Sequence, residues 1–177
     1  MTEFTGFGNQ ALPFLKALDF HQSREWFNEN KSLFVSELET PRGDLVEALT
    51  AAFAAKGLPF KGDRKKSVYR IYRDVRFAKD KSPFNKHVSA LLTPSGEKRE
   101  AEGSFFIKIG IEGCFMAVGF YLDDATKLKV FRNSIVTWPD KFRSMTAALK
   151  NGKLALETDG ALKRMPKEFE AVTEPDL

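Results

Sequence analysis

Basic residues are concentrated in one part of this sequence, and their types indicate what chemistry it could support. Residues 61–86 contain ten lysines and arginines against three aspartates, although the whole chain carries a formal net charge of only +4. At the centre of this stretch, residues 73–84 read RDVRFAKDKSPF. A local excess of positive charge attracts anions, and arginine presents a planar fork of donors that fits a carboxylate or a phosphate. The sequence therefore predicts that binding chemistry centres on residues 70–86, which we call the basic block.

The first hypothesis is that the basic block binds an anion, such as a small molecule that bears a phosphate group. Arginine and lysine would supply the donors, and neighbouring aspartates could hold the arginine forks in place. The candidate ligand-binding residues are Arg70, Arg73, Arg76, Lys79, Lys81 and Lys86. An anion-binding module is therefore the leading interpretation.

Two alternatives use the same residues differently. The block could be the active site of an enzyme that acts on a phosphorylated or acidic small molecule, with Asp74 or Asp80 as the base. Lys81 or Arg76 would then stabilise developing negative charge. The block could instead be an internal salt-bridge network of a structural or interaction protein, in which the two aspartates pair with these cations or with Arg73. Arg73 favours the network, because alternation places it among apolar neighbours, where a charge needs a partner.

Aromatic rings interleaved with basic residues raise nucleic acid as another partner. Tyr69 and Tyr72 are interleaved with Arg70 and Arg73, and single-stranded nucleic acids bind to surfaces of this kind by base stacking and charge. A tyrosine in a strand is more often a packing residue. The sequence thus leaves open whether the partner is a phosphate-bearing small molecule or a nucleic acid.

Motifs of several enzyme classes are missing. The sequence has no GxxxxGK[ST] phosphate loop, no HExxH and no GxSxG. Residues 6–11, GFGNQA, have the spacing of a dinucleotide loop, but no strand precedes them, so we treat the match as chance. One cysteine and two histidines, Cys114, His21 and His87, are too few for a dedicated zinc site. The apolar surroundings of Cys114 favour a buried core side chain. We expect neither a metal nor a cofactor.

Length and composition are those of an ordinary globular chain. At 177 residues, with 42% hydrophobic and 29% charged residues, it is expected to form a single domain over residues 1–177. The longest apolar run, residues 114–122, is far shorter than the roughly 20 residues that cross a bilayer, and the N-terminus lacks the features of a secretory signal. A single cysteine fits a reducing compartment. We predict a cytoplasmic protein without a membrane segment.

Helices are expected at both ends of the chain. Leucines at helical spacing predict a helix over residues 9–19, Ser23 is a suitable N-cap for a second helix, and Pro41 marks the start of a third. In the last third of the chain, Asp123 or Asp124 can cap a further helix. These helices leave the middle of the chain for strands.

The basic block itself is expected to follow a strand. From Ser67 the apolar period becomes two, which predicts a strand that ends at the turn of residues 81–84. In this strand Val75 and Phe77 would anchor the end of the strand in the core, while Arg76 faces the other way.

A hairpin is the clearest feature of the remaining sequence. Residues 87–93 form another strand candidate, and the runs SFFIKIGI and CFMAVGFYL are separated only by Glu112 and Gly113. A glycine-containing link this short is typical of a β-hairpin. The expected fold is α+β, with one mainly antiparallel, meandering sheet flanked by N-terminal and C-terminal helices.

Four stretches of the sequence resemble a known family. They read SREWFNENK near the N-terminus, RDVRFAKDKSPF in the middle, and GFYLDDATKLKVFRNSI followed by LKRMPKEF. In order and spacing they resemble, over nearly the whole chain, the uncharacterised bacterial family catalogued as domain of unknown function 2461. The central match falls on Arg73, Asp74, Arg76, Phe77, Asp80, Lys81, Ser82 and Pro83. The resemblance implies a compact α+β domain of the bacterial cytoplasm without an established activity. Because family members run on beyond KRMPKEF, it also implies that this chain lacks a C-terminal element.

Overall fold

The fold is α+β, as the sequence predicted. A computed structural model describes residues 4–98, 103–120, 124–154, 156 and 162–172. The chain divides into two compact units, residues 1–121 and residues 122–177, which are described separately below. The basic block and the sheet belong to the first unit.

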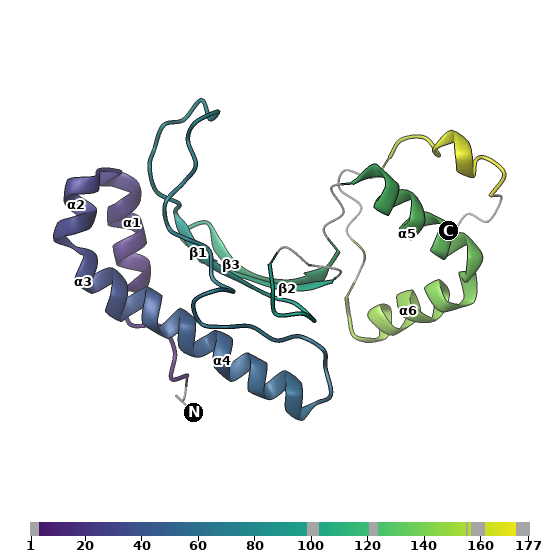
Figure 1. The fold of residues 1–177 in the computed structure, drawn as a ribbon, viewed down its shortest axis with the longest axis horizontal. Coiled ribbons are helices and arrows are strands. Elements are labelled where there is room, and N and C mark those ends of the chain that lie inside the picture. The colour runs from purple at the N-terminus through teal and green to yellow at the C-terminus, as the bar shows by residue number, and fades with distance from the viewer. Residues whose placement is uncertain (1–3, 99–102, 121–123, 155, 157–161, 173–177) are drawn as a thin grey trace. The chain divides into compact units, whose positions relative to one another are not determined.

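A succession of helices opens the first unit (Figure 1). They are α1 (Ala11–His21), α2 (Arg24–Glu29), α3 (Lys31–Phe34), the π-helical turn η1 (Val35–Glu39) and α4 (Thr40–Ala55). Ser23 caps α2 as expected, because its Oγ accepts a hydrogen bond of 3.1 Å from the Trp26 backbone N–H. Pro41 lies in the first turn of α4, where its missing N–H would have no helical partner. These helix predictions are confirmed.

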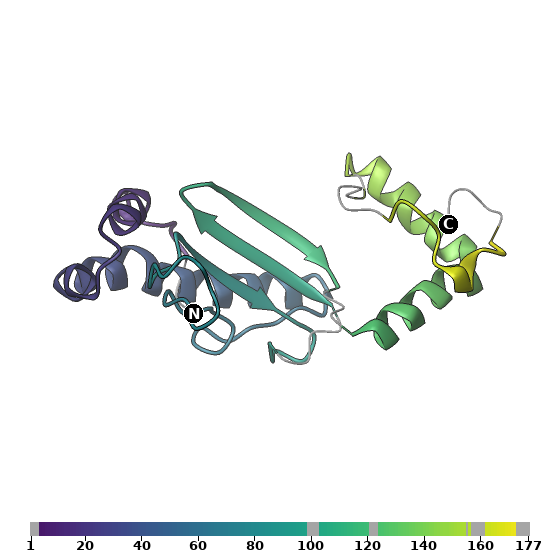
Figure 2. The ribbon, with the colours of Figure 1, turned by 90° about the horizontal axis from the view of Figure 1, so that it is seen from above.

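The sheet has three antiparallel strands in the order β1-β2-β3. The strands are β1 (His87–Leu92), β2 (Ser104–Gly110) and β3 (Gly113–Gly119). The predicted hairpin is β2 and β3, and its turn places Gly113 at φ +125, a conformation that favours glycine. In Figures 1 and 2, α4 runs along the sheet, and it contacts β1.

Two clusters of buried apolar side chains hold the helices to the sheet. The first joins α1 and α2 to β1 and includes Phe27 and Phe84, whose rings stack with centroids 4.7 Å apart. The second joins Val46 of α4 to Leu92 of β1 and Ile107 of β2. Burying one such side chain contributes about 1.5–3 kcal/mol. The clusters therefore fix β1, which forms one wall of the candidate site described below.

The prediction that Cys114 is a buried core residue is wrong. Cys114 is exposed, as are all the other residues of β3. Neither cluster of buried apolar side chains includes a residue of β3, so an apolar composition alone does not bury its side chains. The run from Cys114 onward is thus a hydrophobic strand at an edge.

The strand predicted from Ser67 into the basic block is also absent. Among the described residues, this part of the chain makes only isolated bridges to other segments, which pair Lys61 with Thr93, Val68 with Ala90 and Tyr72 with Phe84. The part of the chain between α4 and β1 then extends away from the sheet as a loop (Figure 1). Phe77, which was expected in the core, is 95% exposed, and Val75 is half-buried.

Side-chain hydrogen bonds to the backbone oppose the formation of a strand within the basic block. The Asp74 carboxylate accepts a hydrogen bond of 3.3 Å from the Arg76 backbone N–H, and the Asp80 carboxylate accepts one of 2.9 Å from the Ser82 backbone N–H. Short polar side chains that bind the backbone in this way compete with a strand ladder. The alternation of residue types could not reveal this competition.

The second unit contains α5 (Ala125–Thr137), α6 (Pro139–Asn151) and the 3-10 turn η2 (Lys167–Phe169). Asp124 caps α5, since its carboxylate accepts hydrogen bonds from the backbone N–H groups of Thr126 at 2.6 Å and Lys127 at 3.1 Å. The helix predicted after Asp123 or Asp124 is therefore confirmed. In the part of the chain that the structure covers, no helix has both the length and the apolar character that crossing a membrane demands.

Candidate functional site

The segment that leads into the basic block is held along β1. The Tyr69 backbone N–H donates to the Ser89 carbonyl at 3.0 Å, and the Leu91 backbone N–H donates to the Ser67 carbonyl at 2.8 Å. The Tyr69 carbonyl accepts a hydrogen bond of 2.8 Å from Nη1 of the buried Arg42 on α4. Residues 67–72, which we call the wall segment, are thus fixed between β1 and α4.

The wall segment and β1 form the sides of an open cavity of about 470 Å³. Its lining residues are Tyr69, Arg70, Tyr72, Arg73, Asp74, Asn85, His87, Ser89 and Phe106. Small-molecule sites usually measure about 300–1,000 Å³ and combine aromatic walls with a few polar groups. The size and the lining of this cavity fit that description.

The cavity brings together only part of the basic block. Arg70, Arg73 and Asp74 line it. The other candidates from the sequence, Arg76, Lys79, Asp80, Lys81 and Lys86, are not among the lining residues. The cavity therefore contains two of the predicted ligand-binding residues, Arg70 and Arg73, and one of the predicted bases, Asp74.

Two of the arginines are paired with the aspartates. Arg73 donates through Nη1 to the Asp80 carboxylate and, at 3.2 Å, to the Ser82 carbonyl. The Arg76 guanidinium forms a two-pronged contact with Asp74, with 3.0 Å from Nε to Oδ1 and 2.7 Å from Nη2 to Oδ2. The contacts with the two carboxylates are charge-assisted hydrogen bonds. Arg73 and Arg76 thus have internal partners.

Two of the lysines also have structural contacts. Lys81 donates through Nζ to the Val75 carbonyl at 3.0 Å and closes the loop of the block. Lys86 forms an ion pair of 2.9 Å with Asp19 of α1. These contacts tie the block to itself and to the N-terminal helices.

Hydrogen bonds lower the carboxyl pKa of both aspartates. The side chain and the backbone N–H of Arg76 lower the pKa of Asp74 to about 2. Hydrogen bonds from the hydroxyl and the backbone N–H of Ser82, followed by Arg73, lower the pKa of Asp80 further. A general base works best when its pKa lies near the working pH. The hydrogen bonds shift the pKa of both aspartates away from that range.

Arg70 differs from the other arginines of the block. Within the described part of the chain, its guanidinium forms no hydrogen bond or ion pair, although its charge helps to lower the pKa of Asp74. Lys79 also lacks such a partner among the same residues, but it does not line the cavity. The hydrogen-bond donors of the Arg70 guanidinium are therefore available to a ligand in the cavity.

Several lining residues were missed by the sequence reasoning. Ser89 and His87 lie two positions apart on β1 and therefore share a face of that strand. Ser89 is only 5% exposed, and its hydroxyl forms no hydrogen bond with any residue that the structure describes. Burial, and then the charge of Lys108, lower the pKa of His87, so its imidazole is neutral at pH 7. The alternation of residues 87–89 was visible, but their neighbours across the sheet were not.

Metal ligands do not gather in the described residues. No group of three histidine, cysteine, aspartate or glutamate side chains lies close enough there to hold an ion. The groups that line the cavity are the cations Arg70 and Arg73, the Asp74 carboxylate, which is paired with Arg76, and uncharged polar and aromatic side chains.

Comparison with known proteins identifies the family. The family model described as "Conserved hypothetical protein (DUF2461)" matches residues 10–176, which is nearly the whole chain. The chain therefore belongs to this family, in agreement with the resemblance of its four sequence stretches. No curated protein and no solved structure matches it.

Proposed function

We propose that this member of the DUF2461 family binds a small anionic molecule, such as one that bears a phosphate group, in the cavity beside β1. Arg70 would contact the anionic group. The observation that carries the proposal is that Arg70 lines the cavity while its guanidinium has no partner among the described residues. Arg73 shares the cavity but is already bound to Asp80.

The rest of the cavity supports a ligand with a ring as well as an anionic group. Tyr69 and Phe106 form an edge-to-face pair with centroids 6.4 Å apart, and both line the cavity together with Tyr72. Aromatic walls favour a flat partner. Ser89 is a buried residue of this lining, and its hydroxyl, which has no hydrogen-bond partner among the described residues, adds a donor.

The proposal favours binding over catalysis by the aspartates. Asp74 and Asp80 are carboxylates with low pKa values and arginine or serine partners. They orient Arg76 and Arg73, so the salt-bridge hypothesis explains these two ion pairs. The anion-binding hypothesis explains why Arg70 lines the cavity without such a partner among the described residues. The two hypotheses thus apply to different residues of the same block.

Phenyl phosphate is a suitable probe, because it combines a phosphate group with a ring. We expect it to bind the wild-type protein in isothermal titration calorimetry, and Arg70→Gln to weaken binding about tenfold or more, as loss of a charge-assisted hydrogen bond does. Lys79→Gln is the matched control, since it removes a cation of the same block that lies outside the cavity. Equal loss in the two variants, or no binding to the wild type, would refute the proposal.

A further inference from the structure

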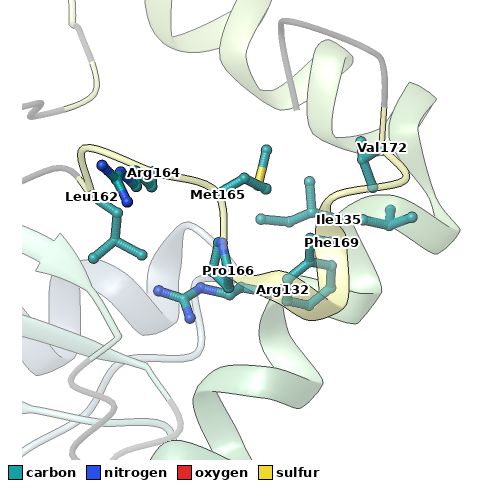
Figure 3. A pocket seen from close by; sticks show the side chains of 9 residues that line it. Arg132, Ile135, Leu162, Arg164, Met165, Pro166, Phe169 and Val172 are labelled. Carbon is teal, nitrogen blue, oxygen red and sulfur yellow. The ribbon is translucent and has the colours of Figure 1, made fainter.

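A second cavity lies within the unit formed by residues 122–177 and measures about 310 Å³ (Figure 3). Its lining residues are Arg132, Ile135, Val136, Leu162, Arg164, Met165, Pro166, Phe169 and Val172. None of them belongs to the basic block, and part of this lining comes from the LKRMPKEF stretch. The cavity is therefore independent of the site proposed above.

Helix α5 and the segment of residues 162–172 form the two sides of this cavity. Arg132, Ile135 and Val136 are spaced three and four residues apart and so share one face of α5. An ion pair of 3.1 Å between Lys129 and Glu168 ties the segment to the helix. Phe169, at 6% exposure, is buried between them. The cavity is thus held by contacts on both of its sides.

The lining combines an apolar surface with two cations. Apart from Arg132 and Arg164, all of the lining side chains are apolar. Neither guanidinium forms a hydrogen bond or an ion pair with the described residues. In Figure 3 both guanidinium groups lie toward the side of the cavity opposite Val172, while Ile135 and Phe169 lie between. The cavity thus has a cationic end and an apolar body.

We infer that this cavity binds a carboxylate with a compact apolar body. Arginine matches the planar carboxylate, which can accept two parallel hydrogen bonds from one guanidinium. The apolar side chains would cover the hydrocarbon part of such a ligand. At about 30 Å³ for each water-sized group, a cavity of 310 Å³ holds roughly ten non-hydrogen atoms. That is the size of a medium-chain carboxylate such as octanoate.

Octanoate is the probe, and its neutral and cationic analogues test the role of charge. We expect saturable binding of octanoate to the full chain in isothermal titration calorimetry. Binding of 1-octanol should be at least about tenfold weaker, because it lacks the charge that the arginines would meet. Octylammonium should be weaker still, since its charge has the wrong sign. Equal affinity for octanoate and 1-octanol would overturn the inference, as would a wild type that shows no saturable binding of octanoate.

Substitutions test whether the two arginines of the cavity bind octanoate. Arg132→Gln and Arg164→Gln should each weaken octanoate binding about tenfold or more. Lys127→Gln removes a charge from the same helix outside the cavity and should leave the affinity unchanged. A loss in Lys127→Gln that equals the loss in the arginine variants would overturn the inference. Arg132→Gln could disturb α5, which circular dichroism would show as a loss of helicity. Arg164 lies outside the helices, so in that case Arg164→Gln and the comparison of the three ligands still test whether the cavity binds a carboxylate.

Each of the two proposed binding sites can be refuted independently of the other. Arg70→Gln should leave octanoate binding unchanged, and Arg164→Gln should leave phenyl phosphate binding unchanged. If Arg70→Gln weakened octanoate binding as much as Arg164→Gln does, octanoate would occupy the cavity beside β1, and the inference would be wrong.

Discussion

Asp74 accepts two hydrogen bonds from one edge of the Arg76 guanidinium, with distances of 3.0 Å and 2.7 Å. The two residues are only two positions apart, so this contact shapes a local turn and does not join distant parts of the fold. Of the two arginines that line the cavity, Arg73 pairs with Asp80, and only Arg70 lacks a partner among the described residues. The division between paired and unpaired cations underlies the predictions for this block.

Acid should remove the contribution of Asp74 to stability. Hydrogen bonds from Arg76 lower the carboxyl pKa from 3.8 to about 2, so folding favours the carboxylate. The contribution is fully present above the unfolded pKa of 3.8 and is lost as the pH falls through about 2. Thermal unfolding should give wild type a slightly higher Tm than Asp74→Asn at pH 7, because an exposed pair is screened by solvent. This difference should shrink as the pH falls from 3.8 through about 2, and a difference that does not change with pH would contradict the assignment.

Arg42→Ala should destabilise the first unit. Arg42 is 3% exposed, and its Nη1 is the donor to the Tyr69 carbonyl in the wall segment. Loss of the donor leaves a polar group without its partner, which costs about 1–3 kcal/mol. The free energy of unfolding from urea titration should fall by that amount. Arg24→Ala, at an exposed position of α2, is the control and should change it little; equal effects would show that the Tyr69 contact contributes nothing.

Two phenylalanines in residues 73–84 should respond differently to truncation. Phe77 is 95% exposed, so Phe77→Ser should stay within about 0.5 kcal/mol of wild type in the free energy of unfolding. Phe84 is 1% exposed and stacks on Phe27, so Phe84→Ala should lower the free energy of unfolding by about 3–5 kcal/mol. Chemical denaturation measures both. A large loss in Phe77→Ser would restore the original expectation that Phe77 belongs to the core.

Salt dependence separates a small anion from a nucleic acid. A nucleic acid that contacts several cations releases many counterions, so its affinity falls steeply with salt. In that case Arg70→Gln and Lys79→Gln should weaken binding to a single-stranded oligonucleotide similarly, since both side chains lack partners among the described residues. We expect instead that phenyl phosphate binding depends weakly on salt and mainly on Arg70. Fluorescence anisotropy with a labelled oligonucleotide, at two salt concentrations, provides the comparison.

Local sequence signals predicted the local structure well. Ser23 and Asp124 cap the helices that were expected after them, and Gly113 forms the turn of the predicted hairpin. Each of these features depends on residues within a few positions of one another. Such features can be read from residue types because the interacting groups are neighbours in the chain.

The cavity could not be predicted in the same way. Ser89 meets Tyr69 across twenty positions, and Phe106 joins them only because β2 pairs with β1 in one register. Register between distant segments depends on the whole core, and the sequence pattern around residues 67–77 suggested a longer strand than the fold allows. The sequence therefore indicated the cationic residues but not which of them face a cavity.

The outer position of β3 affects how the protein behaves in concentrated solution. Among the described residues no strand pairs with its free edge, and Phe115, Met116 and Val118 are exposed along it. An open apolar edge is a template for another strand, so we expect turbidity to rise with protein concentration. Met116→Lys should suppress it, because a lysine at a strand edge opposes pairing with another chain. The hairpin that completes the sheet is thus also the place where we expect a strand of another chain to pair.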